Sequence, residues 1–295
     1  MENIMANFYT TLYRSESGQT TTVLSPGEEV PPFLTSEMRH AIETMPRGKA
    51  PGADGITMEL LQACGPTLYT ALARRFSVYL PKCEVPVAWK QSSTILLFKS
   101  DKGDLENYCP ITLLPVLYKV FTRSTLTRIR RTLDEAQPVE QPGFRRKFST
   151  MDHIITCCRL IEVAREYQEA LVLTFIDYKK AFDSVEPARV RKALEEQGVE
   201  ARYTNVLSEC YSRCITEFRP FPNDIEVSVE KGVRRGDPIS PNLFSACLAS
   251  VIRICDWSTF AVVIDGERLN HLRFADDIVL IMRSPDDASE MLDEE

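Results

Sequence analysis

Two adjacent carboxylates between two short apolar runs constrain the fold more than any other stretch of the chain. Residues 272–275 form the first run, and residues 278–282 form the second. Short runs of this kind, the second rich in β-branched residues, predict strands rather than helices. The simplest geometry is a hairpin with Asp276 and Asp277 at its tip. Asp is also an ordinary turn residue, but neighbouring negative charges repel, and a divalent cation that binds oxygen ligands would remove the repulsion.

A third carboxylate ends another apolar run. Residues 170–176 are almost continuously apolar and lead directly into Asp177. A run that is apolar on both faces predicts a strand covered on both sides. If this strand is a neighbour of the hairpin, three carboxylates meet at one point and can hold two metal ions for phosphoryl or nucleotidyl transfer. A two-metal nuclease would use the same acids.

The order of six segments resembles the reverse transcriptases of non-LTR retrotransposons. The segments are residues 48–56 (Gly-Lys-Ala-Pro-Gly-Ala-Asp-Gly-Ile), 107–114 (Asn-Tyr-Cys-Pro-Ile-Thr-Leu-Leu), 141–145 (Gln-Pro-Gly-Phe-Arg), 175–185 (Phe-Ile-Asp-Tyr-Lys-Lys-Ala-Phe-Asp-Ser-Val), 232–244 (Gly-Val-Arg-Arg-Gly-Asp-Pro-Ile-Ser-Pro-Asn-Leu-Phe) and 274–277 (Phe-Ala-Asp-Asp). The last three look like the family's motifs A, B and C. Each segment alone is a weak signal, but six in the family's order are highly specific, and a nuclease does not fit that order.

The resemblance implies an α+β fold, namely the fingers and palm of a right-hand polymerase. An antiparallel palm sheet would be backed by helices, and a thumb would be absent. We expect an N-terminal extension and linker at residues 1–33, fingers at 34–168, a palm at 169–285 and a truncated acidic tail at 286–295.

Local patterns add three expectations about the helices. A helix or helix pair over residues 57–80 should break near Gly65. Asp183 and Glu186 read as a capping box for a helix over residues 187–197. A second helix should follow over residues 201–214.

The resemblance also implies RNA-directed DNA synthesis by two-metal catalysis. The catalytic residues would be Asp177, Asp276 and Asp277, of which we rank the first two higher, since the first acid of each motif bridges both metals in the family. These carboxylates would bind two Mg²⁺ ions, with Mn²⁺ as an alternative and the carbonyl of Tyr178 as an extra ligand. The expected partners are an RNA template, a DNA primer and deoxynucleoside triphosphates.

Four further positions are expected to bind the nucleotide. Lys99 is the candidate for the triphosphate, as a point charge, and Phe182 lies where the family's aromatic residue excludes the ribose 2′-hydroxyl. Gly236 permits close approach of the backbone to the nascent base pair, and Arg235 precedes it. Core packing for Phe182 and a solvated loop for Lys99 remain open alternatives.

Nucleic-acid contacts are expected from two basic segments. Lys49 lies in a Gly/Pro loop, and bases alternate with aromatic residues in the second segment, which suits a phosphate backbone and a stacked base. The second segment contributes Arg145, Arg146 and Lys147. A turn at Lys49 and a solvated basic loop in the second segment are the structural alternatives.

Two residues depart from the family's pattern. Cys109 stands where the family usually has Arg, and Arg235 stands where it usually has Gln. A lost charge-assisted hydrogen bond costs about 1.5–3 kcal/mol, which is roughly a 10- to 150-fold rate loss if the bond acts mainly in the transition state. The sequence also stops soon after the Asp-Asp pair. The alternative function is therefore a truncated or decayed, catalytically inactive fragment that at most binds nucleic acid.

Charge and cysteine content bound the remaining possibilities. The formal net charge of −7 is unusual for a nucleic-acid binder, but residues 284–295 alone hold six acids and no base. Nine cysteines without a Cys-x-x-Cys spacing or a secretory signal predict reduced thiols of an intracellular protein with no disulfide-linked partner. We expect no membrane association, since no apolar run is long enough to span a bilayer, and a nuclear location is expected from the family alone.

Overall fold

The computed structural model describes residues 2–15, 29–98, 105–145, 148–218, 224–255, 257–264 and 266–294. Its helices and strands mix along the chain as in an α+β protein. In chain order they are α1 (Glu2–Tyr13), α2 (Thr35–Glu43), α3 (Met58–Lys82), β1 (Gln91–Phe98), β2 (Tyr108–Leu113), α4 (Val116–Ala136), α5 (Thr150–Tyr167), β3 (Val172–Asp177), α6 (Ala181–Ser184), α7 (Pro187–Glu196), α8 (Ala201–Tyr211), β4 (Cys214–Phe218), β5 (Ile225–Val229), α9 (Ser240–Ile252), β6 (Val262–Ile264), β7 (Glu267–Leu269), β8 (His271–Phe274), β9 (Asp277–Met282) and α10 (Pro285–Glu294).

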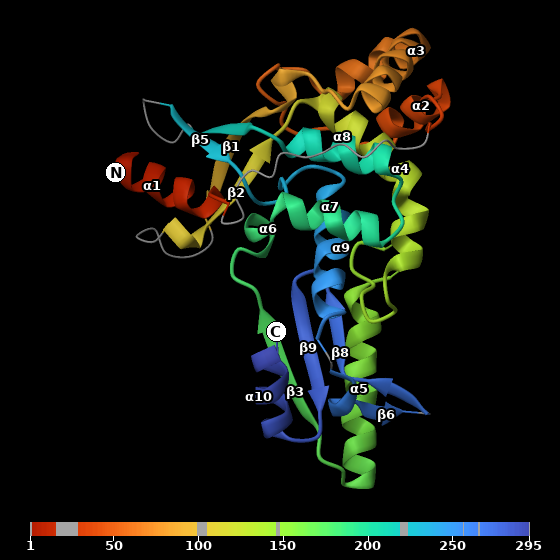
Figure 1. The fold of residues 1–295 in the computed structure, drawn as a ribbon, viewed down its shortest axis with the longest axis vertical. Coiled ribbons are helices and arrows are strands. Elements are labelled where there is room, and N and C mark those ends of the chain that lie inside the picture. Colours follow the sequence, from red (N-terminus) through yellow and green to blue (C-terminus); the bar gives the residue numbers. More distant parts are fainter. Residues whose placement is uncertain are drawn as a thin grey trace.

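A three-stranded antiparallel sheet of order β3-β9-β8 forms the lower part of the molecule in Figure 1. The predicted strands are therefore neighbours. Helix α5 covers one face of the sheet through Leu160, which packs with Leu272 and Ile281. Helix α10 packs against β3 and β9. The sheet and its covering helices confirm the predicted α+β class, with an antiparallel sheet backed by helices.

A four-stranded sheet of order β2-β1-β4-β5 lies in the upper part of the molecule (Figure 1). Strands β1 and β4 run parallel, and the other two pairs are antiparallel. The sheet thus joins strands from both sides of residue 169. Helix α8 ends at Tyr211, and Cys214 opens β4, so the expectation of a helix as far as residue 214 is wrong.

Helix α1 packs against the four-stranded sheet. Its residues Met5, Tyr9 and Tyr13 are buried, and the ring of Tyr9 stacks on Phe218 with centroids 4.4 Å apart. The backbone carbonyl of Tyr13 accepts hydrogen bonds from the N–H groups of residues 230 and 231, at 3.0 and 3.1 Å. The first helix of the chain is therefore attached to β4 by its side chains and to the end of β5 by its backbone.

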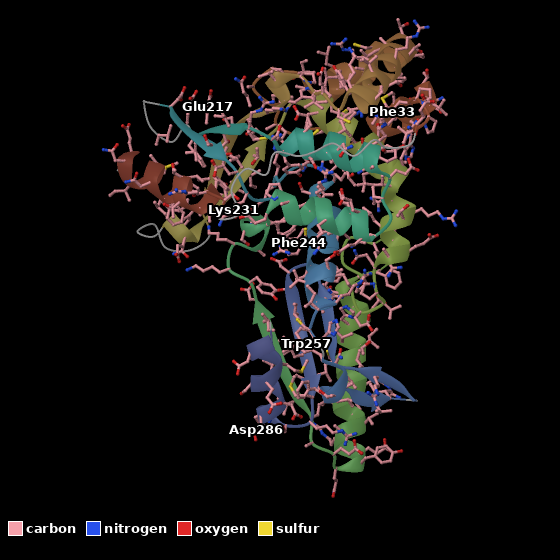
Figure 2. All side chains as sticks on the ribbon, viewed as in Figure 1. Phe33, Glu217, Lys231, Phe244, Trp257 and Asp286 are labelled. Carbon is pink, nitrogen blue, oxygen red and sulfur yellow. The ribbon has the colours of Figure 1, made fainter. Side chains whose placement is uncertain are left out.

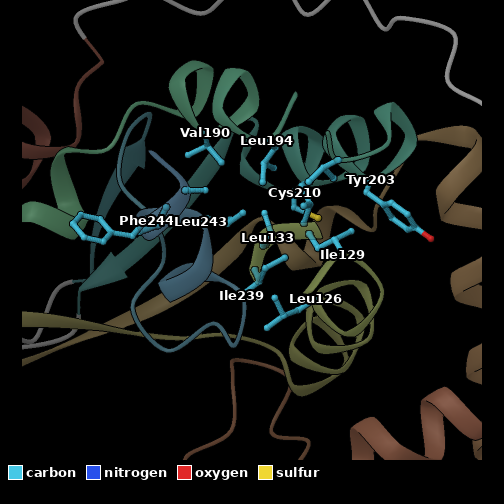
Figure 3. Packing of buried hydrophobic residues seen from close by; sticks show 14 of the residues in the cluster. Leu126, Ile129, Leu133, Val190, Leu194, Tyr203, Cys210, Ile239, Leu243 and Phe244 are labelled. Carbon is cyan, nitrogen blue, oxygen red and sulfur yellow. The ribbon is translucent and has the colours of Figure 1, made fainter. Parts of the chain in front are cut away.

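The main hydrophobic core joins the helices to the three-stranded sheet through residues of β3 and β9. Figure 3 shows side chains of α4 facing α8, α9 and α7 across this core. The labelled contributors include Leu126, Ile129, Leu133, Val190, Leu194, Cys210 and Leu243. Burying one such side chain contributes roughly 1.5–3 kcal/mol, so this packing fixes the position of α9 beside the ends of β3 and β9.

The remaining helix predictions divide into one success and one failure. Gly65 has non-helical backbone angles (φ 70°, ψ −161°) inside α3, which confirms the expected break. The capping box is wrong. Glu186 is the N-cap of α7 and makes no side-chain capping bond, while Asp183 is buried in α6.

Candidate active site

The three predicted catalytic acids lie at one end of the three-stranded sheet. Asp177 is the last residue of β3 and is paired in register with Asp277, the first residue of β9. Phe274 pairs with Asp277 across the β8–β9 hairpin, so Ala275 and Asp276 form its two-residue turn. Only Asp276 is thus within the turn itself, and Asp277 belongs to the strand. Two segments a hundred residues apart in the sequence bring their carboxylate-bearing backbones side by side.

Asp177, Asp276 and Asp277 place negative charges near one another. None of the three makes an ion pair with a residue that the structure describes. Partial burial, followed by the charges of Asp276 and Asp177, raises the pKa of the Asp277 carboxyl. Hard carboxylate oxygens that repel one another fit a divalent cation.

The acids are not gathered into a closed metal site. Among the residues with described positions, no three Asp, Glu, His or Cys side chains are placed so that they could hold a metal ion. Asp177 and Asp277 are exposed and Asp276 is half-buried. Exposed side chains change rotamer readily, and the backbones of Asp177 and Asp277 lie side by side.

Phe182 lies between two other aromatic rings. Its ring is parallel to that of Phe244 on α9, with centroids 4.5 Å apart and an interplanar angle of 10°, and Phe144 meets it edge-on at 6.4 Å. Figure 2 places Phe244 where the upper part of the molecule meets the three-stranded sheet. The ring of Phe182 is only half-buried, so core packing explains one face of it and leaves the rest accessible.

Arg235 connects the two positions that depart from the family pattern. One terminal nitrogen of its guanidinium donates to the Sγ of Cys109 at 2.8 Å, and the other lies 3.3 Å from a carboxylate oxygen of Asp183. The guanidinium carbon also lies 5.6 Å from the centre of the Phe182 ring. Its Nε is buried with no hydrogen-bond partner among the described residues. Arg235 thus places a positive charge beside the stacked rings.

Gly236 allows the segment after Arg235 to lie against β2. Its φ of +105° is in the region that favours glycine, and a Cβ atom at this position would lie 2.9 Å from the carbonyl oxygen of Thr112. The N–H of Thr112 donates to the carbonyl of Arg235 at 3.1 Å. The sequence predicted that the backbone at Gly236 would lie close to a base pair. In this structure the same backbone lies close to β2.

A buried polar network beneath this segment was missed by the sequence analysis. Both carboxylate oxygens of Asp237 accept hydrogen bonds at 2.7 Å, one from Tyr118 and one from Thr122 of α4. Arg234 donates to the carbonyls of Trp89 and Cys210. Burial raises the pKa of the Asp237 carboxyl despite these bonds. Arg234 and Asp237, three positions apart in the 232–244 segment, could have suggested buried polar contacts, but the sequence does not show which residues they would contact.

Two of the four predicted nucleic-acid contacts, Lys49 and Arg145, lie within the described residues. Lys49 is exposed in a loop whose Gly52 rests on the backbone of Pro115, where a Cβ would lie 2.6 Å from its nitrogen. Arg145 is half-buried, with its guanidinium carbon 5.2 Å from the centre of the Phe148 ring. Lys99, Arg146 and Lys147 lie outside the described residues. The half-buried Tyr178 packs against the main core, directly after Asp177.

A cavity of about 20 Å³ beside Arg235 is lined by hydroxyl side chains that include Thr94, Thr112 and Thr216. That volume holds about one water molecule. The described helices include none that is both long and apolar enough to cross a membrane, and all nine cysteines carry free thiols.

Comparison with known proteins gives a consistent result. A family model described as reverse transcriptase (RNA-dependent DNA polymerase) matches residues 99–294. The R2 retrotransposable-element Pol polyprotein of Popillia japonica is 29% identical over 85% of this chain, and the RNA-directed DNA polymerase of the mobile element jockey of Drosophila melanogaster is 27% identical over 84%. The transposon TX1 149 kDa protein of Xenopus laevis is 25% identical over 85%.

These relatives are much longer proteins. The matched region covers 35% of the R2 polyprotein, 27% of the jockey polymerase and 19% of the TX1 protein. The chain therefore spans about a third or less of each of them.

Proposed function

This chain belongs to the reverse transcriptase family, and we propose that it catalyses template-directed DNA synthesis on RNA at Asp177, Asp276 and Asp277. It is a reverse transcriptase domain of the non-LTR retrotransposon kind, as its similarity to the R2 and jockey proteins indicates. One observation carries the proposal of the site. The in-register pairing of Asp177 with Asp277 joins the acids of two distant motifs at one end of a sheet.

The carboxylates and the Tyr178 carbonyl are the proposed metal ligands. Two Mg²⁺ ions, or Mn²⁺ in their place, would supply charge that lowers the pKa of the primer 3′-hydroxyl and neutralises the triphosphate. The protein's own contribution is positional. Strand pairing fixes the backbones of Asp177 and Asp277, and the hairpin turn fixes that of Asp276.

Residues above the acids are proposed to position the incoming nucleotide. The accessible edge of Phe182, held from behind by Phe244, would lie under the sugar. The charge of the half-buried Arg235 would meet a phosphate, because Asp183 is its single ion-pair partner among the described residues and its Nε has no hydrogen-bond partner among them. Lys99 is proposed as the second triphosphate contact, and Gly236 keeps the intervening backbone close to β2.

The proposed nucleic-acid partners are an RNA template and a DNA primer. Lys49, Arg145, Arg146 and Lys147 would contact their backbones, with Phe148 beside Arg145 as a stacking surface. We assign the region around residues 34–168 to the fingers and 169–285 to the palm, with β4 and β5 joining the fingers sheet in space. A nuclear site of action follows from the family alone.

Primer extension on an RNA template tests the proposed function. Purified protein should extend a DNA primer in Mg²⁺ or Mn²⁺, and Asp177→Asn and Asp276→Asn should each reduce the rate by roughly 100-fold or more, since each removes a ligand charge at the reacting centre. Asp286→Asn is the matched control, because Asp286 is an exposed acid at the opposite end of the sheet (Figure 2). No extension by the wild-type chain with either metal would refute polymerase activity in this chain.

A second candidate function is nucleic-acid binding without catalysis. The contacts of Arg235 with Cys109 and Asp183 favour this second function. They hold the guanidinium that would otherwise be available to the phosphates of a nucleotide. Fluorescence anisotropy with a labelled RNA–DNA primer-template separates the two functions. Binding that falls with salt while extension is absent would support this second function, and salt-sensitive binding together with extension would support the polymerase.

A further inference from the structure

The backbone at the end of β8 is held from outside the sheet. Strand β8 is an edge strand, paired on one side with β9. The N–H of Arg273 donates to the carbonyl of Glu140 at 2.8 Å, and the carbonyl of Arg273 accepts from Nε2 of His153 at 2.9 Å. In an antiparallel pair, alternate residues point their N–H and C=O groups away from the partner strand. At Arg273 these outward groups find hydrogen-bond partners in Glu140 and His153, more than a hundred residues earlier in the chain.

Gln141 continues this outer pairing into the turn. Its side-chain amide accepts from the N–H of Ala275 at 3.2 Å and donates to the carbonyl of Ala275 at 3.2 Å. The same Oε1 accepts the N–H of Gly143 at 3.1 Å. The amide thus replaces the N–H and C=O of a neighbouring strand at the residue just before Asp276. We call Glu140, Gln141 and His153 the hairpin brace.

The conformation of Ala275 explains why a brace is needed. Ala275 has φ of 60°, which a residue with a Cβ adopts at a cost unless its surroundings enforce it. Gln141 is fully buried, and Gly143 packs so closely that a Cβ there would lie 2.5 Å from the nitrogen of Ala275. The fit leaves the Ala275 peptide little freedom.

From this geometry we propose that Gln141 is a positioning residue that orients Asp276 and Asp277 by fixing the Ala275 peptide. It touches neither substrate nor metal and acts through the hairpin turn. The proposal rests on the proposed two-metal site, because the orientation of the acids matters only if they bind ions. It assigns the 141–145 segment a role at the carboxylates, distinct from the nucleic-acid contact expected of Arg145.

Gln141→Met tests the proposal, because it keeps the side-chain volume and removes all three hydrogen bonds. Gln197→Met is the matched control. Gln197 is also a buried glutamine, and its amide donates to the carbonyl of Ala246 at 3.1 Å, far from the hairpin in the sequence. Gln141→Leu also removes the hydrogen bonds without adding a charge, so it serves if Gln141→Met does not fold.

Two measurements on the full chain decide the outcome. In Gln141→Met, amide hydrogen exchange in residues 272–280 should become about tenfold faster. The Kd for Mn²⁺, measured by electron paramagnetic resonance, should rise about tenfold. Both quantities should be unchanged in Gln197→Met. Faster exchange with an unchanged Mn²⁺ Kd would reduce Gln141 to a structural role and overturn the proposal, as would unchanged exchange. A wild-type chain that binds no Mn²⁺ would instead refute the metal site on which the proposal rests.

Discussion

The guanidinium of Arg235 lies among three groups that respond to it in different ways: the carboxylate of Asp183, the thiol of Cys109 and the ring of Phe182. Positions 109 and 235 therefore share one small volume. A second guanidinium at position 109 would meet the first, so the residues at the two positions are chemically coupled. Cys109 and Arg235, the two departures from the family pattern, therefore form one pair of coupled substitutions.

Cys109→Arg alone should therefore destabilise the protein. Two cations in partly buried contact repel, and we expect the free energy of unfolding in urea to fall by about 1–3 kcal/mol. Adding Arg235→Gln should recover most of this loss, which gives an interaction energy above about 1 kcal/mol in a double-mutant cycle. Cys64→Arg, at an exposed position on α3, should change stability by less than about 0.5 kcal/mol. Additive effects of the two substitutions would show that positions 109 and 235 are independent.

His271 predicts a loss of stability in mild acid. Burial, and secondarily the charge of Arg273, lowers its pKa to about 3, against about 6.5 in an unfolded chain. Between these pH values the unfolded chain binds a proton that the folded chain does not. The free energy of unfolding should therefore fall as pH drops below 6.5, by up to about 1.4 kcal/mol per pH unit.

His271→Phe isolates this effect, because it keeps an aromatic ring against Trp257, whose centroid lies 5.3 Å from that of His271. Urea unfolding at pH 7 and pH 5 gives the loss in the free energy of unfolding between these pH values. This loss should be larger in the wild type than in the variant by roughly 2 kcal/mol. Equal losses in the two proteins would assign acid sensitivity to other groups.

At the scale of elements, the segment between β5 and α9 depends on glycine at position 236. Gly236→Ala should cost about 2–4 kcal/mol in urea unfolding, because the Cβ would add a clash with Thr112 to the strain of a positive φ. Gly198→Ala is the control, with φ of +81° and open space around the added Cβ, and should cost about 1 kcal/mol. Equal costs for the two variants would mean that contact with β2 does not constrain this segment.

Sequence patterns identified the elements that carry a local signal, such as an apolar run or a glycine next to a proline. The apolar runs of β3 and β9 and their terminal acids gave neighbouring strands, and the break at Gly65 followed from glycine and proline chemistry. The capping box failed because Asp183 is drawn into contact with Arg235, fifty residues away. A tertiary ion pair of this kind leaves no local signal.

Strand β4 shows a different reason for failure. Along Cys214–Phe218, Thr216 is buried and Ile215 is 37% exposed, which reverses the usual pattern of polar and apolar residues. The hydroxyl of Thr216 lies 2.6 Å from that of Thr94 on β1, so a hydrogen bond offsets the burial. The partner was needed to recognise the strand. The same holds for Gln141, whose role depends on a turn 134 residues later.

Across the whole molecule, the first helix contributes to the stability of the sheet it covers. Tyr9 is fully buried against Phe218, and Tyr9→Ala should lower the free energy of unfolding by about 3–5 kcal/mol. Phe8→Ala, next in sequence and only partly buried, should cost clearly less. Calorimetric melting of both variants checks the prediction, and a Tyr9→Ala loss no larger than that of Phe8→Ala would mean that α1 is attached only loosely.

The parallel pairing of β1 with β4 has a consequence for synthesis of the chain. While a ribosome makes the protein, β1 and β2 emerge well before β4, and about 100 further residues must follow β2 before β4 can join them. Throughout that interval the nascent hairpin presents one open edge, of the kind that recruits other extended chains. The exposed Ile95 and Leu97 of β1 make chaperone capture at this stage the expected route to a soluble product.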